Sequence, residues 1–150
     1  MEKLIRRVLL FASIGGGSIG SIMVAIDIAT SDQLTKETVI SNGLLIVVFI
    51  YTVYAGLQFS RSRSSIKNLT RAFFLQIPWI TSPIISFKIA SGIGASFAII
   101  YSTLNYKYRL SLGADYTLSL YSDQPLGIGI NLAAVSFLIF IQLYKNPSEN

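Results

Sequence analysis

The chain of 150 residues contains no cysteine and no histidine. Without cysteine it can form no disulfide bond, no thiolate nucleophile and no cysteine-ligated zinc site. Without histidine it lacks the usual general base of enzyme catalysis and the most common protein ligand for metal ions. Together, the two absences exclude the Ser-His-Asp triad and the familiar zinc sites.

Charge is also scarce in this sequence. Only 13% of the residues are charged, compared with about 25% in ordinary soluble domains, and 52% are hydrophobic. This composition predicts a single unit with much of its surface in contact with lipid. Nucleic acid, anionic lipid or membrane topology would each account for the formal net charge of +5, and the positions of the basic residues decide among them.

No catalytic constellation is visible in the sequence. The acidic residues do not form a cluster of metal ligands, and no Gly-Lys-Ser/Thr of a phosphate-binding loop follows the segment 92–96, GIGAS. A serine activated by Lys88 is the one nucleophilic arrangement left open. We therefore expect a protein that is not an enzyme and that uses no cofactor and no metal ion.

Three apolar stretches are long enough to cross about 30 Å of hydrocarbon as helices. They cover residues 8–29, 38–59 and 125–144, and residues 60–83 form a basic and apolar connector after the second stretch. The first stretch follows a basic head, as a secretory signal would. Its length and the lack of a clean small-residue cleavage site indicate an uncleaved anchor instead.

The segment 84–121 has a different pattern, with large apolar side chains at every second position. They fall on odd numbers from Ile85 to Tyr101 and on even numbers from Leu104 to Leu120. Alternation of this kind predicts strands with one buried face. The expected strands cover about 84–91, 95–103, 104–112 and 115–121, with glycine turns at 92–94 and 113–115; one long bent strand over 95–112 is the alternative.

These patterns predict an α+β integral membrane protein with three transmembrane helices and a small antiparallel β module, 84–121, before the last helix. The alternative is an all-α protein with four membrane helices, the third over about 80–103. Three spans place every basic residue except Lys36 and Lys145 on one side. Four spans bury Lys88 in the bilayer, at a cost of at least about 2.5 kcal/mol. We therefore expect three spans, with the N-terminus cytoplasmic and the C-terminus outside.

Small and polar residues within the apolar stretches are candidates for helix packing. Gly16 and Gly20 are four positions apart, as are Gly17 and Ser21, and this spacing lets two helices approach closely within one chain or between copies. Asn131 is expected to act as a packing clamp or as part of a polar path.

One acidic residue and one group of basic residues are further candidate membrane sites. Asp27, inside the first stretch, is either an interfacial residue or a polar membrane site for a proton or ion. The connector holds basic residues without any acid, which predicts cytoplasmic topology and contact with anionic lipid and does not require nucleic acid. These residues are Arg61, Arg63, Lys67 and Arg71.

The apolar face of the β module requires a cover, and the candidates are segment 72–83, the membrane surface or a second copy. We therefore expect a non-enzymatic protein whose β module mediates self-assembly or partner binding at the cytoplasmic face. A pore-forming or permeabilising effector is the first alternative, and a membrane enzyme is the second. The arrangement of anchors, β segment and final helix resembles small bacterial membrane proteins, which implies the inner membrane.

Overall fold

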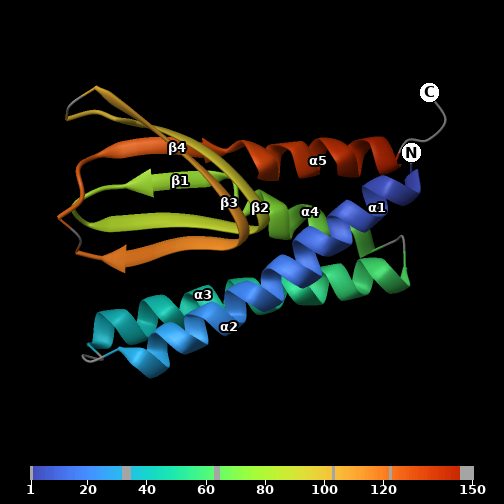
Figure 1. Cartoon of the computed structure of the whole chain (residues 1–150), viewed down its shortest axis with the longest axis horizontal. Helices are drawn as coiled ribbons and strands as arrows, with labels where there is room; N and C mark the ends of the chain where they lie inside the picture. The colour runs from blue at the N-terminus through green and yellow to red at the C-terminus, as the bar shows by residue number, and fades with distance from the viewer. Residues whose placement is uncertain (1, 32–34, 63–64, 103, 122, 146–150) are drawn as a thin grey trace.

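The computed structural model describes residues 2–31, 35–62, 65–102, 104–121 and 123–145. Within these residues the protein is α+β, with helices beside a curled four-stranded antiparallel sheet (Figure 1). The expected α+β class with an antiparallel β module is therefore confirmed, the all-α alternative is wrong, and the expectation of three transmembrane helices stays a prediction.

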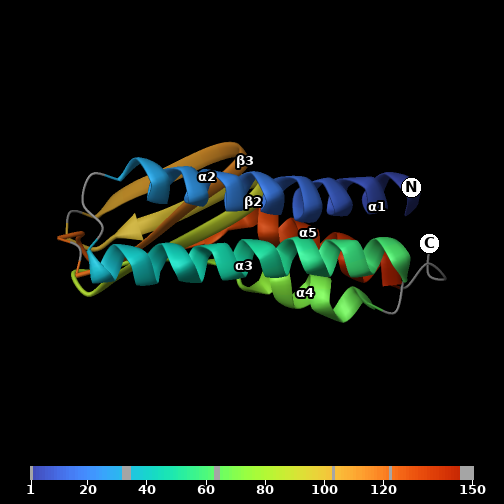
Figure 2. The same cartoon turned by 90° about the horizontal axis from the view of Figure 1, so that it is seen from below.

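Two long helical segments run side by side in opposite directions (Figure 2). The first consists of α1 (Glu2–Leu10), a π-helical turn η1 (Phe11–Gly15) and α2 (Gly16–Thr30). The second is α3 (Lys36–Arg61), whose first turn is capped by Thr35. Each segment is long and apolar enough to cross a membrane, and the predicted spans 8–29 and 38–59 lie within them.

The predicted third span, 125–144, differs from the structure. Its first part is the strand β4 (Gly127–Asn131), and only α5 (Leu132–Lys145) is helical. Gly129 allows β4 to lie close against the sheet, since a Cβ atom there would stand 2.3 Å from the carbonyl oxygen of Phe97. With 14 residues, α5 is too short to span a bilayer alone.

The β module consists of two long strands, where four short ones were expected. Strands β2 (Ile85–Ile100) and β3 (Asn105–Leu120) pair along their whole length. The apolar positions change phase at the turn between them, because the register pairs odd positions of β2 with even positions of β3, as in Ile99 with Tyr106. The alternation therefore predicted strands correctly.

The two strands bend together at Gly92 and Gly113. The sequence had predicted turns at these places, over residues 92–94 and 113–115. The bend lets the first part of β2 pair with β1 (Pro78–Thr81) and its second part pair with β4. Because β1 also pairs with β4, the sheet curls around on itself. In Figure 1 the β2–β3 pair arcs over and returns toward the end from which it started.

The curled sheet lies along α2 and the first half of α3 (Figure 2). Its core there includes Val24, Leu45, Phe49 and Ile89. A second core joins α1, the end of α3, α4 (Ile66–Phe74) and α5. The sheet and the helical half thus occupy the two ends of the elongated molecule.

The end of α5 lies beside the start of α1, and the expected placement of the two chain ends on opposite sides of a membrane stays a prediction. The ring of Tyr144 packs edge-on against Phe59, with 5.4 Å between centroids, in the same core as Ile5. The physical reason is the division of residues 127–145 into a strand and a short helix. The strand β4 starts at the far end of the sheet, and α5 leads back to the helical half (Figure 1).

Candidate ligand-binding cleft in the curled sheet

The curled sheet has a polar inner face and an apolar outer face. On its inner face, Lys88 is 3% exposed and Asp115 is 7% exposed. On its outer face, Tyr108 and Leu112 are each 84% exposed. Since successive side chains of a strand point to opposite faces, the alternation in the sequence produces this separation directly.

The helices cover only part of the outer face. Ile89 packs with Phe49 of α3, and Tyr116 meets the same ring edge-on, with 5.6 Å between centroids. The remainder, called the outer apolar wall below, lies on β3 and the neighbouring strands β2 and β4. Its large exposed members are Ile93, Phe97, Tyr106, Tyr108, Leu110, Leu112, Ile128 and Ile130.

Three charged side chains meet on the inner face. One carboxylate oxygen, Oδ2 of Asp115, lies 2.7 Å from Nζ of Lys88 and 3.0 Å from Nε of Arg109. The Lys88 ammonium also lies over the ring of Trp79, 5.2 Å from its centroid. A buried ammonium requires such a partner, because water no longer solvates it.

A cleft of about 380 Å³ lies over these charges. Its lining includes the basic residues Lys88, Lys107 and Arg109. The carboxylate of Asp115 compensates part of their positive charge through its contacts with Lys88 and Arg109. No carboxylate is present among its described lining residues. The remaining lining residues are Trp79, Thr81, Ser86, Tyr108, Thr117, Ser119 and Gln124.

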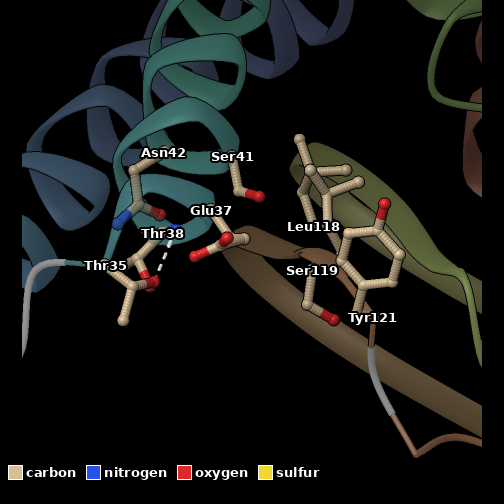
Figure 3. Close-up of a pocket in the computed structure, with 9 residues that line it drawn as sticks. Thr35, Glu37, Thr38, Ser41, Asn42, Leu118, Ser119 and Tyr121 are labelled. Carbon is tan, nitrogen blue, oxygen red and sulfur yellow. Dashed lines mark hydrogen bonds between the residues drawn. The ribbon is translucent and has the colours of Figure 1, made fainter.

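A second cleft, of about 530 Å³, lies between the start of α3 and the end of β3 (Figure 3). Its polar groups belong mainly to the first turns of α3, where the Thr35 side chain accepts a hydrogen bond from the amide of Thr38. The Ser41 hydroxyl is buried, with no partner among the described residues. Ser119 lines both clefts, so they adjoin at β3. Among the described lining residues of the second cleft, only Glu37 is charged.

The glycines predicted for helix packing lie at contacts within the chain. A Cβ atom on Gly17 would stand 2.8 Å from Cγ2 of Val53, and one on Gly20 would stand 2.4 Å from Cε1 of Phe49. Gly16 instead faces the bend of β2, where its Cβ would stand 1.8 Å from the Gly92 nitrogen. The hydroxyl of Ser21 donates to the carbonyl of Gly17.

Asn131 is a buried cap at the junction of β4 and α5. Its Oδ1 accepts hydrogen bonds from the amides of Ala133 and Ala134 in the first turn of α5, at 3.1 and 3.4 Å. The same oxygen accepts from the amide of Ala95 in β2, at 3.3 Å. Asn131 therefore fixes the helix to the sheet.

Asp27 connects a helix to the sheet. It is exposed near the end of α2, and its carboxylate accepts a hydrogen bond from the hydroxyl of Tyr116 in β3. Its expected proton or ion role stays a prediction.

The basic residues of the connector lie at the helical end of the molecule. Arg61 ends α3, while Lys67 and Arg71 are exposed on α4. Arg63 lies outside the described residues. Contact of these side chains with anionic lipid stays a prediction.

Sequence reasoning missed the charged cleft. As a site residue it considered Lys88 only as a partner for a serine, and it assigned no ligand-binding role to Lys107, Arg109 or Asp115. All four occupy positions of the polar face, so the alternation itself carried the signal. The described residues contain no group of three or more acids that could hold a metal ion. The chemistry present on the inner face is that of anion binding.

Comparison with known protein families, characterised proteins and solved structures gives no match for this chain. The site therefore has to be interpreted from its own geometry.

Proposed function

We propose that this chain is a non-enzymatic integral membrane protein whose curled sheet assembles with the sheet of a second copy within the membrane. The observation that carries this proposal is the outer apolar wall, which is uncovered and continuous with an open strand edge. Tyr108, Leu110 and Leu112 on β3 are each at least 79% exposed. Apolar surface of this extent marks contact with lipid or protein.

The position of the sheet supports a location at membrane depth. It lies beside α2 and the first half of α3, which are parts of the two segments able to span a bilayer (Figure 2). The basic residues of α1 and α4 lie at the opposite end of the molecule, and the positive-inside rule places that end in the cytoplasm. In this proposal the sheet occupies the outer half of the membrane, which departs from the cytoplasmic face expected from the sequence.

The open edge of β3 supports assembly between copies. Among the described strands, β3 pairs only with β2, so its other edge has free amide and carbonyl groups. In lipid each unsatisfied group costs several kcal/mol, and open edges are not tolerated there. Antiparallel pairing of β3 with β3 of a second copy satisfies both edges about a two-fold axis. The joined sheet keeps a polar interior and an apolar exterior, as barrels in membranes do.

The contacts of Lys88 support the non-enzymatic part of the proposal. Its ammonium donates to Asp115 at 2.7 Å and lies over Trp79. These contacts engage the ammonium in an ion pair and a cation–π interaction, whereas activation of a serine requires a neutral amine beside the hydroxyl.

Cysteine cross-linking in native membranes tests the assembly. The chain has no cysteine, so single substitutions along β3 from Tyr106 to Leu112 introduce the only thiol. Mild oxidation is expected to give disulfide-linked dimers, with a maximum at one position and a weaker signal at alternate positions on either side. Opposed residues of an antiparallel pair lie within disulfide reach.

Val47→Cys is the matched control, because Val47 is an exposed apolar residue on α3. Equal dimer yields at Val47 and throughout β3 would indicate random collision and refute the proposal. The absence of dimers at every β3 position would also refute it.

A permeabilising effector is the second candidate, and the polar inner face of the sheet favours it. In this structure the bend of the sheet packs against the helical half, where Gly92 lies against Ala12 of η1. Conduction would therefore require the sheet to separate from η1. If induced expression leaves membrane potential and ion leakage unchanged, this candidate is excluded.

A further inference from the structure

We propose that the cleft on the inner face of the curled sheet binds a phosphate group through Arg109 and Lys107. This inference goes beyond the assembly proposed above. It does not depend on that assembly, because every residue that it uses belongs to one copy of the chain.

Arg109 has the geometry of an anchored anion receptor. Its Nε lies 3.0 Å from Oδ2 of Asp115, while the residue as a whole stays open to the cleft, with a side chain that is 60% exposed. Holding Nε in this way fixes the plane of the guanidinium group and leaves its two terminal nitrogens for a ligand. A planar pair of donors matches two oxygens of a phosphate.

Lys107 supplies a second charge on the same face. It is two positions from Arg109 along β3, and both residues line the cleft. Counting Lys88, Lys107 and Arg109 against Asp115 gives three positive charges and one negative charge, a local excess of two. That excess is matched by a phosphate and would be left uncompensated by a neutral ligand.

Hydroxyl groups complete the lining. Thr117 and Ser119, on the second half of β3, line the cleft together with Arg109, and each hydroxyl is able to donate to a phosphate oxygen. The Thr81 hydroxyl, also from a lining residue, is buried without a partner among the described residues. The lining thus offers neutral donors beside the two cations.

The phosphate can come from a lipid headgroup or from a soluble molecule. Tyr108 belongs both to the lining of the cleft and to the outer apolar wall, so the two surfaces meet at this residue. A phospholipid in the cleft would have Leu110 and Leu112 available for its acyl chains. Both sources present the same group to Arg109, and the experiment separates them.

Trp79 is the only tryptophan of the chain, and it lines the cleft. Its fluorescence therefore reports directly on a ligand that reaches Lys88. The full-length protein in a neutral detergent is titrated with inorganic phosphate, with short-chain phosphatidylglycerol and with short-chain phosphatidylcholine. A saturable change in Trp79 emission is expected with phosphate, with phosphatidylglycerol or with both.

Three variants test the residues. Lys107→Gln and Arg109→Gln are each expected to raise the half-saturation concentration by about tenfold or more, the effect of losing one charge-assisted contact. Arg109→Lys keeps the charge and is expected to recover part of the binding. Lys36→Gln is the matched control, since it removes one exposed positive charge at the start of α3 and is expected to leave the titration unchanged.

The titrations identify the source of the phosphate group and can overturn the proposed site. Saturation by phosphatidylglycerol alone assigns the site to a lipid headgroup, and saturation by inorganic phosphate assigns it to the free anion. The absence of a saturable change with both inorganic phosphate and phosphatidylglycerol overturns the proposal. An equal loss in Lys36→Gln also overturns it, as does an unchanged titration in Lys107→Gln, because that variant removes no contact of the Asp115 carboxylate and keeps Arg109 in place.

Discussion

Gly92 and Gly113 lie directly opposite each other in the β2–β3 ladder, and both have positive φ, at 79° and 98°. Residues with a Cβ atom rarely adopt this conformation, so glycine at both positions allows the paired strands to bend together. Arg109 and Asp115 are six positions apart on one strand, and the bend brings Nε of Arg109 to 3.0 Å from Oδ2 of Asp115. In a straight strand the Cα atoms of these residues would stand about 20 Å apart.

Replacement of Gly113 tests the origin of the bend. Gly113→Ala has room for its methyl group, since the nearest atom to an added Cβ is Cγ2 of Ile19 at 3.5 Å. Its cost therefore comes from the backbone, and we expect a loss of about 1–2 kcal/mol of stability. Thermal unfolding in detergent measures it. Gly43→Ala is the control, because Gly43 lies in α3 with nothing within 4 Å, and this variant is expected to be neutral or stabilising. Equal stability of both variants would show that positive φ at Gly113 is not required.

The ion pair of Lys88 and Asp115 predicts a strong asymmetry between single and double variants. Asp115→Asn leaves a buried ammonium without its carboxylate and is expected to cost about 3–5 kcal/mol. Replacing both partners, in Lys88→Met combined with Asp115→Leu, removes the charges together and is expected to recover most of that loss. Unfolding by denaturant compares the variants. If the double variant is less stable than Asp115→Asn, the pair does not behave as a buried salt bridge.

Asn131 predicts a local effect at the start of α5. Asn131→Ala removes the acceptor for the amides of Ala133 and Ala134, and we expect a loss of about 1–2 kcal/mol. Hydrogen exchange of these two amides is expected to accelerate, while Asn131→Asp keeps the acceptor oxygen and protects them. Ser136→Ala is the control on the exposed side of the same helix. Equal exchange in Asn131→Ala and Ser136→Ala would contradict the role of Asn131 as a cap.

The contact between α1 and α5 predicts where the two chain ends lie if the protein spans a membrane as proposed. Because the end of α5 lies beside the start of α1, labels attached to the two chain ends are expected on the same side of the membrane. A label at Asn105, near the β2–β3 turn, is expected on the opposite side. Single cysteines probed with an impermeant thiol reagent make this measurement. Chain ends on opposite sides would instead support three complete spans.

The sequence determined the element types because these depend on local periodicity. Alternation from Ile85 to Leu120 predicted strands with a polar and an apolar face, and both long strands follow it. The apolar stretches 8–29 and 38–59 predicted the two long helices. Their hydrophobicity is a property of consecutive residues, so no tertiary information was needed.

Only the tertiary structure decided which face of the sheet is enclosed. The alternation along a strand specifies one polar and one apolar face, but not which of them is enclosed by the fold. The apolar face was expected to be buried. Curling around the bend at Gly92 and Gly113 turned the polar face inward instead, and left Tyr108 and Leu112 outside. It also divided residues 125–144, because whether Gly127–Asn131 forms a strand depends on partners in β1 and β2 that are remote in sequence. The charged cleft exists because this long-range pairing joins residues that no local pattern connects.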